Sequence, residues 1–329
     1  MSGEILVLSR ADIERLMDYD DYVDAVEAGL RGAATGGALA PPAAAFHVPG
    51  GSYHAKAAAL LGDGTAFMAI KLNGNYPGNP ATNGLPTVQG VLYLADASNG
   101  RPLALMDSIE VTIKRTGATT TIAARHLARL DSRVATICGA GVQGRVQATA
   151  IAAAVRLDTL HIWDIRPDAA AALARDLSKE LGIDVRASAD LSVTRTSDVV
   201  VTCSSAREAY LTSDLVRPGT FIAAVGADNS DKSEIAPLLY ARCRVVVDSV
   251  EQCAEIGDLH HAIAAGTVTV GHIHASLAEI VAGQKTGRGN DLEITLFDST
   301  GMGLQDVSAA AAIYRRALQQ GGGTHLTLS

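Results

Sequence analysis

The chain has 329 residues and a formal net charge of −8, and its length favours two domains over one. Hydrophobic residues make up 48% of it, aromatic residues only 4%, and glycine is abundant at 32 residues, a balance that suits an α/β protein with closely packed helices. An acidic protein repels phosphate backbones and anionic lipid, so neither nucleic acid nor a membrane surface is expected as a partner.

The cysteine pattern and the first residues predict a cytoplasmic protein. None of the four cysteines forms a C-x-x-C pair, and three of them lie in or beside apolar runs, which is typical of small buried side chains rather than of a disulfide framework. The N-terminus lacks a basic region followed by an apolar stretch, and no run approaches the ~18 apolar residues of a membrane span.

Residues 1–125 are expected to form an α+β domain with an antiparallel sheet. A short apolar strand at 5–8 precedes two helices, of which the second covers 21–31, and a loop rich in Gly, Ala and Pro follows over 32–45. Between residues 46 and 105, short β-type runs alternate with turn clusters, and 96–100 is typical of a hairpin turn. A long helix over 109–130 completes the segment.

Residues 126–304 show a different rhythm, in which apolar or β-branched runs are separated by helix-length segments. This pattern predicts a parallel sheet that is covered on both faces. The runs lie at 134–138, 159–163, 198–202, 221–225 and 245–247, with a sixth at 294–297. The C-terminal segment 305–329, with a helix over 305–319, is expected to join the first domain.

A glycine pattern inside this second region indicates a ligand. The run from Val134 to Gly144 places G-x-G-x-x-G between a predicted strand and a predicted helix, which is the context of a dinucleotide-binding turn. Gly139 allows the tight turn, Gly141 lets a pyrophosphate approach the backbone, and Gly144 lets the helix pack on the strand. We therefore predict a Rossmann-type domain over 126–304.

An acidic residue after the next strand indicates which dinucleotide binds. Asp164 lies 20 residues beyond Gly144, where a carboxylate accepts hydrogen bonds from the adenosine ribose. It would repel a 2′-phosphate, so NAD is favoured over NADP, although Arg166 could accommodate that phosphate. Further cofactor contacts are expected from the glycine turn and from the ends of later strands, at Val142, Gln143, Thr202, Ser204, Val225, Gly226, Ser299 and Gly301.

Several separate motifs, in order, make the chain resemble the ornithine cyclodeaminase/mu-crystallin family over nearly its whole length. They lie at Lys71 with 73–75 and 77–79, and at 84–87, 107–118, 225–228, 280–283 and 296–301. The family contains cyclodeaminases, alanine dehydrogenase-like enzymes, imine and ketimine reductases, and NADP-binding crystallins. The resemblance implies a homodimer in which the N-terminal sheet domain and the C-terminal helix build the dimer and one wall of the active site.

The resemblance also implies roles for individual residues. Lys71 would hold the substrate carboxylate or polarise its carbonyl, and Arg115 would pair with the carboxylate through its guanidinium fork. Asp228, after a buried strand, matches the family's general acid/base, and Thr87 belongs to a motif expected at the substrate. The non-functional alternatives are a solvated lysine at the end of a strand for Lys71, a surface ion pair on a helix for Arg115, and a turn or N-cap aspartate for Asp228.

One strand departs from the ornithine-cyclising members of the family, which carry an arginine after the proline-rich loop and an acidic residue after a Met-Pro pair. Here residues 41–46 contain no arginine, Lys56 stands at the methionine position, and no acid follows. The missing acid argues against a distal ammonium on the substrate. Lys56 suits a carboxylate or a diacid, with an outward-facing strand lysine as the alternative. His54 could donate to the substrate, but a strand histidine packed at the rim of the site is the favoured interpretation.

We therefore predict NAD-dependent hydride transfer at Cα of a small amino or imino acid, as in an alanine dehydrogenase or an imine reductase. Two alternatives stay open: a cyclodeaminase that uses bound NAD, and a non-catalytic crystallin-like NAD(P)-binding protein. No metal is expected, because the histidine pairs 260–261 and 272–274 have no associated cysteine or tight acidic pairing.

Overall fold

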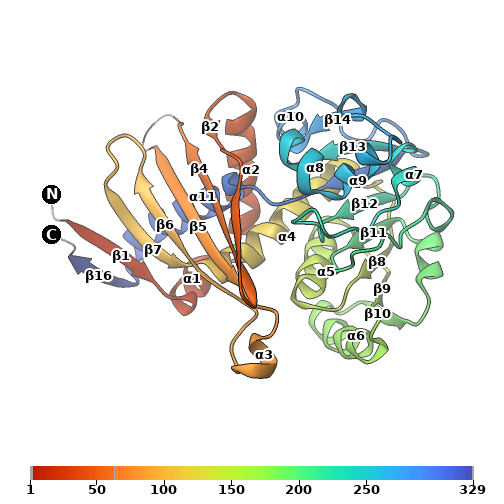
Figure 1. Cartoon of the computed structure of the whole chain (residues 1–329), viewed down its shortest axis with the longest axis horizontal. Coiled ribbons are helices and arrows are strands. Elements are labelled where there is room, and N and C mark those ends of the chain that lie inside the picture. Colours follow the sequence, from red (N-terminus) through yellow and green to blue (C-terminus); the bar gives the residue numbers. More distant parts are fainter. Residues whose placement is uncertain (1–2, 63, 65, 328–329) are drawn as a thin grey trace. The chain divides into compact units, whose positions relative to one another are not determined.

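The computed structural model describes residues 3–62, 64 and 66–327, and the chain folds into two compact units (Figure 1). Unit 1 runs to Thr119 and resumes at Met302, whereas unit 2 covers 120–301. The division falls inside helix α4 (Ser108–Leu127), a few residues before the boundary that the sequence suggested.

Unit 1 is built on a mixed, mostly antiparallel sheet in the order β16-β1-β7-β6-β5-β4-β2, with β3 paired to β4. Only the β1–β7 pair is parallel among the described strands of this sheet. The strands are β1 (Glu4–Leu8), β2 (Ala38–Leu39), β3 (Ala44–Val48), β4 (Gly51–Leu60), β5 (Phe67–Asn75), β6 (Val88–Asp96), β7 (Pro102–Asp107) and β16 (Thr324–Thr327). The predicted antiparallel region over 46–105 is confirmed, including the hairpin turn between β6 and β7. The predicted 32–45 loop was wrong over 32–34, which are helical, and at β2 and the start of β3, where isolated Ala and Leu residues carry no β-type pattern.

The first two helices of unit 1 begin where the sequence supplies caps. Ser9 and Asp12 form a capping box at the start of α1 (Arg10–Leu16), and Asp18 and Asp21 form another at α2 (Tyr19–Ala34). A short helix α3 (Asn79–Thr82) follows β5, and the C-terminal helix α11 (Gly303–Gln320) belongs to this unit. Because α11 packs on β4, β5 and α2, the last helix of the chain shares one core with the N-terminal sheet.

Helix α11 packs closely on one face of the sheet, so the side chains on that face of β5 are buried beneath it. A Cβ added at Gly303 would lie 2.4 Å from the Ala57 carbonyl oxygen of β4, so only glycine allows this approach. On β5 the side chains alternate, because Lys71 is buried on the face that α11 covers whereas Ile70 and Leu72 are exposed on the other. The covered face therefore carries a charged residue, and the open face is apolar.

Unit 2 contains an all-parallel sheet in the order β10-β9-β8-β11-β12-β15-β13-β14, which confirms the predicted Rossmann-type fold class. The strands are β8 (Val134–Cys138), β9 (Thr159–Trp163), β10 (Asp184–Ser188), β11 (Val199–Thr202), β12 (Phe221–Ala224), β13 (Cys243–Val247), β14 (Ile273–Ser276) and β15 (Ile294–Asp298). Their α-helices are α5 (Val142–Ala154), α6 (Pro167–Leu181), α7 (Pro237–Tyr240), α8 (Val250–Ile256), α9 (Asp258–Ala264) and α10 (Leu277–Val281). No helix among the described residues is both long and apolar enough to cross a membrane.

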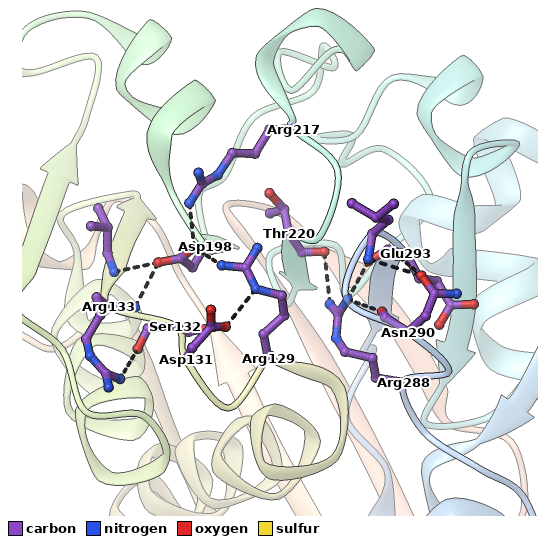
Figure 2. A network of polar contacts seen from close by, with 12 residues as sticks. Arg129, Asp131, Ser132, Arg133, Asp198, Arg217, Thr220, Arg288, Asn290 and Glu293 are labelled. Carbon is purple, nitrogen blue, oxygen red and sulfur yellow. Dashed lines mark hydrogen bonds and ion pairs between the residues drawn. The ribbon is translucent and has the colours of Figure 1, made fainter.

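A network of arginine contacts lies at the N-terminal ends of the strands of this sheet (Figure 2). Asp198, next to the start of β11, accepts hydrogen bonds from Arg129 Nη2 at 2.8 Å and Arg217 Nη2 at 2.5 Å. The same carboxylate accepts the main-chain N–H groups of Arg133 and Val134 at 2.8 and 3.0 Å. One buried carboxylate thereby joins α4's C-terminal loop to the first residues of β8 and β11.

Arg288 likewise joins several segments beside the start of β15, as Figure 2 shows. Its guanidinium donates to the carbonyl oxygens of Leu127 at 2.7 Å and Glu293 at 2.5 Å, and to the Thr295 hydroxyl at 2.9 Å. It also donates to the Asn290 carbonyl oxygen at 3.1 Å. A planar fork with five donors suits this set of acceptors, and an ammonium does not.

We expect Arg288→Lys to lower the free energy of unfolding by ~2–4 kcal/mol, because partly buried carbonyl oxygens lose their donors. Urea unfolding followed by the fluorescence of Trp163, the single tryptophan, reports this loss in unit 2. The matched control is Arg195→Lys at the exposed ion pair with Asp214, where the change should stay below ~1 kcal/mol. Equal effects of the two substitutions would show that the Arg288 contacts do not stabilise the sheet.

Candidate functional site

The glycine turn after β8 has the shape that a pyrophosphate requires. Gly139 has a backbone φ of 126°, a value that residues with a side chain rarely adopt. A Cβ added at Gly144 would lie 2.0 Å from the Gly139 carbonyl oxygen, so glycine is needed at this position too. A Cβ at Gly141 would meet nothing within 4 Å, so the turn is open at the N-terminus of α5. Val142 is exposed there, and the Gln143 side-chain oxygen lies 3.4 Å from Gln147 Nε2. The residues present therefore fit a dinucleotide phosphate group.

Asp164 is attached to this turn. Its Oδ2 accepts a hydrogen bond from the Ala140 main-chain N–H at 2.7 Å, and its Oδ1 accepts the Arg166 main-chain N–H at 2.8 Å. The Arg166 side chain is exposed and lies 3.4 Å from the same carboxylate. The acid is thus fixed beside the glycine turn, with the arginine next to it.

The later strands bring the other predicted cofactor residues to one edge. The main-chain N–H of Val225 donates to Thr202 O, and that of Ser299 donates to Ala224 O, both at 2.9 Å. The carboxyl ends of β11, β12 and β15 are therefore level, and this is the edge where α/β sheets bind ligands. Thr202, Ser204, Val225, Gly226, Ser299 and Gly301 all lie on or just after these strand ends.

Two buried acids that the sequence analysis missed hold these loops. The first is Glu234, whose Oε1 accepts hydrogen bonds from the main-chain N–H and the hydroxyl of Ser204, both at 2.7 Å, and from the Tyr210 hydroxyl at 2.8 Å. Burial, together with the charge of Asp258, raises the pKa of Glu234 to about 7. A Cβ at Gly226 would lie 2.1 Å from Glu234 Oε2, so glycine is required beside this acid.

Asp248 is the second of these acids, and it organises the loop after β15. It accepts the Gly301 main-chain N–H at 2.7 Å and the hydroxyls of Ser299 and Thr300 at 3.0 and 3.1 Å. Its position directly after the apolar run 245–247, like that of Asp164 after β9, was the available sequence signal. For Glu234 no motif gave a comparable signal.

Asp228 lies four residues beyond β12 and is 53% exposed. Its carboxylate is 2.7 Å from Lys232 Nζ and accepts a hydrogen bond from Asn229 Nδ2 at 3.1 Å. Lys232 Nζ also donates to the Gly226 carbonyl oxygen at 3.0 Å, so the ion pair connects Asp228 to the strand end. The acid is accessible, as a proton-transfer group must be.

Unit 1 contains a buried cluster of charges built from β5, α4 and α11. Lys71 Nζ lies 2.9 Å from Asp306 Oδ1 and 2.8 Å from Oδ2, and Arg115 Nε lies 3.0 Å from Oδ1. Arg115 Nη1 donates to Gln305 Oε1 at 2.6 Å. All four side chains are almost completely buried. We call Lys71, Arg115, Gln305 and Asp306 the cation cluster.

The pKa values in the cation cluster reflect one acid shared by two bases. Burial and the neighbouring Arg115 charge lower the pKa of Lys71 to about 7, although Asp306 opposes them. Burial disfavours the ionised form of Asp306, but the charges of Lys71 and Arg115 outweigh it and lower its pKa. The cluster therefore holds an ionised acid and an incompletely compensated set of cations, which is an attractive environment for an anion.

The remaining predicted substrate residues lie at different places in unit 1. Lys56 pairs directly with Lys71 in the β4–β5 register and so faces the same side of the sheet. His54 lies two residues earlier on β4, with Nε2 2.9 Å from the Ser52 hydroxyl. Thr87 lies beyond the paired end of β5 and β6, where its carbonyl oxygen accepts the Tyr76 main-chain N–H. No group of three or more His, Cys, Asp or Glu in the described part of the chain is placed to hold a metal ion.

A Rossmann-type domain with an open glycine turn defines a dinucleotide-binding protein, and comparison with known proteins shows its family. The chain belongs to the ornithine cyclodeaminase/mu-crystallin family, whose model matches residues 4–321. It is 34% identical to an alanine dehydrogenase of Archaeoglobus fulgidus over 323 residues, which cover 98% of both chains.

Two solved structures share the whole fold. An archaeal alanine dehydrogenase dimer with bound NAD superposes with a TM-score of 0.94 at 33% identity, covering 99% of this chain and all of the other. The Δ1-pyrroline-2-carboxylate reductase of Thermococcus litoralis, in complex with NADH and L-proline, gives 0.92 at 35% identity, with 97% and 99% covered. Both relatives bind NAD in one of its redox states, and their names describe different substrates.

Proposed function

We propose that this chain is an NAD-dependent oxidoreductase that acts at Cα of a small amino or imino acid. The observation that carries the proposal is the cation cluster, in which Lys71 and Arg115 share a single buried acid, Asp306. An α-carboxylate supplies the missing negative charge, and every amino or imino acid carries one. The glycine turn with Asp164 provides the features that hold NAD. Two relatives with almost the same fold support the assignment, since their names describe redox chemistry on such acids.

Each group of residues has its own task in the proposed reaction. Lys71 and Arg115 bind the carboxylate and so fix the direction in which Cα–H points. Asp228 takes a proton from, or returns one to, the substrate nitrogen or a water molecule. When bound, NAD accepts a hydride from Cα or gives it back.

The charge on β4 limits the substrate. Lys56 lies opposite Lys71 and repels a distal ammonium, with a cost of ~4 kcal/mol at a separation of ~4 Å and an effective dielectric of ~20. An ornithine-type substrate is therefore disfavoured, and a neutral or acidic side chain is favoured. The Lys56 charge therefore favours a dehydrogenase or reductase over the cyclodeaminase alternative.

We further propose a homodimer formed through the open face of the unit 1 sheet. Ile70, Leu72 and Val91 are 39%, 40% and 43% exposed there, and Leu72 and Val91 pair directly across β5 and β6. A contiguous apolar face of this kind marks an interaction surface. The archaeal alanine dehydrogenase relative is a dimer. Light scattering should give twice the mass of one chain, and a monomer at micromolar concentration would contradict the proposal.

Asp164 should determine the choice of cofactor. We expect NADH to bind more tightly than NADPH, and Asp164→Ala to remove roughly 10- to 100-fold of that preference, the range for a charge-assisted hydrogen bond. Fluorescence titrations with both nucleotides measure it. Asp168→Ala, which removes an exposed acid from the first turn of α6, is the matched control and should leave the preference unchanged. Tighter binding of NADPH by the unmodified protein would instead identify Arg166 as a phosphate ligand.

A screen of NADH oxidation tests the function itself. We expect turnover with pyruvate or another keto acid in the presence of ammonia or methylamine, or with a cyclic imine. A protein that binds NADH but consumes none with any of these substrates would be the non-catalytic alternative. Release of ammonia from ornithine, measured in parallel, would indicate the cyclodeaminase alternative.

A further inference from the structure

We propose that the side-chain amide of Gln305 is a third ligand for the substrate carboxylate, beside Lys71 and Arg115. This inference rests on the proposed function, because it completes the carboxylate site assigned there. Gln305 lies on α11, in a part of the sequence that carries no recognised binding motif. It is therefore identified by its contacts alone.

The orientation of the Gln305 amide is fixed by its neighbour. A guanidinium has donors and no acceptor, so the atom that faces Arg115 Nη1 at 2.6 Å must be the amide oxygen Oε1. The nitrogen Nε2 is bonded to the same carbon as Oε1, which places it within roughly 5 Å of Arg115 Nη1. The donor end of the amide therefore belongs to the cation cluster.

That donor end has no hydrogen-bond partner among the residues that the structure describes, and Gln305 is only 1% exposed. A buried amide that cannot reach water and has no acceptor is unusual in native proteins, and each such group calls for an explanation. A ligand that brings an acceptor into the cluster supplies that explanation.

The composition of the cation cluster specifies the chemistry of the ligand. Lys71, Arg115 and Gln305 all present donors, and Asp306 is the only acid among the four. Arg115 Nε is close to Asp306 but is not aligned for a hydrogen bond, so within the described residues it too lacks an acceptor. Asp306 Oδ2 also lacks a hydrogen bond to any described residue, but it is 2.8 Å from Lys71 Nζ and so is already paired with a charge. A carboxylate has two oxygens with about four acceptor positions, which fits the two donors of Gln305 and Arg115 that remain without an acceptor in this part of the chain.

The helix that carries Gln305 is held in a defined position. Gly303 lies against the Ala57 carbonyl oxygen of β4, and Asp306 is bound to Lys71 of β5 and Arg115 of α4. Asp306 is accordingly a positioning residue, since it sets the separation of the two cations. Gln305, the preceding residue, is kept at the same site by the same contacts.

A rival explanation is that Gln305 only orients Arg115 through its oxygen atom. A double-mutant cycle separates the two, using Gln305→Met, which keeps the length of the side chain and removes both polar atoms. The full-length protein is saturated with NADH in the absence of ammonia and methylamine, so that none of the probes can be reduced as an imine. Binding of pyruvate, L-proline and L-alanine is then followed by the change in NADH fluorescence. Each measurement is repeated in an Arg115→Met background.

We expect Gln305→Met to weaken carboxylate binding about tenfold in the unmodified protein and at least threefold in the Arg115→Met background, with unchanged NADH affinity. Ser308→Ala, at another buried polar position of α11, is the control and should change neither. A loss that disappears in the Arg115→Met background, or no loss at all, would overturn the inference while leaving the proposed function intact. An unmodified protein that binds none of the three probes would overturn both.

Discussion

Asp228→Asn is expected to lower turnover by about 100- to 10,000-fold, the range for loss of a general acid/base, while NADH binding stays the same. Asparagine keeps the shape of the side chain and can still accept from Asn229 Nδ2, but it cannot take up a proton at neutral pH. Because the Asp228–Lys232 pair is half exposed, its loss should cost little stability. The chemical step should therefore be affected and the fold should not.

Steady-state kinetics and an NADH titration of the same preparation measure both quantities. The matched control is Asp231→Asn, which removes an exposed acid from the same loop and should leave turnover within about twofold. If Asp228→Asn retains a kcat near that of the unmodified protein, Asp228 does not transfer the proton, and its ion pair with Lys232 is structural.

Arg115→Lys should reduce kcat/KM by roughly 30- to 1,000-fold, which corresponds to ~2–4 kcal/mol of transition-state binding. Lysine retains the charge but loses the planar fork that reaches Gln305 Oε1 and a carboxylate together. The matched control is Lys114→Arg, the neighbouring residue on α4, whose ion pair with Glu110 is exposed on the lysine side. Unchanged turnover and substrate affinity in Arg115→Lys would remove Arg115 from the site.

The cation cluster also predicts how substrate binding depends on pH. With the Lys71 pKa lowered to about 7, the ammonium is present below that pH and is lost above it, so carboxylate affinity should fall as the pH rises through 7. The Arg115 charge is one cause of the lowered pKa, so Arg115→Gln should weaken binding but move the fall to higher pH. A fall that stays at the same pH in the variant would show that another group titrates.

The fold could be predicted where the pattern of apolar residues matched the way each strand is buried. The strands β11 and β12 are buried on both faces and appear in the sequence as uninterrupted apolar runs. By contrast, β10 reads Asp-Val-Arg-Ala-Ser at the edge of the sheet, and β16 is exposed throughout, so neither carries such a run. Strands of that kind exist because a neighbour offers hydrogen bonds, which a single sequence does not reveal.

The residues of the candidate sites also differ in whether the sequence alone could identify them. The residues of the glycine turn and the strand ends follow a local spacing, so Gly139, Gly144 and Asp164 could be placed from their positions along the chain. The partners in the cation cluster are 235 residues apart for Lys71 and Asp306, and 190 apart for Arg115 and Gln305. Only the contacts of α11 with β5 and with α4 bring them together, and no local pattern marks Gln305 or Asp306 as functional.

The stoichiometry of NADH consumption is the most direct test of the central claim, that this chain performs net hydride transfer on a small amino or imino acid. One preparation is supplied with NADH, ammonia and a panel of keto acids and cyclic imines, and separately with NAD and L-ornithine, while NADH and ammonia are both followed. The proposed function predicts one NADH consumed for each amino acid formed from at least one member of the panel, and little reaction with ornithine. Efficient conversion of ornithine to proline and ammonia with no net change in NADH would contradict it and establish the cyclodeaminase alternative.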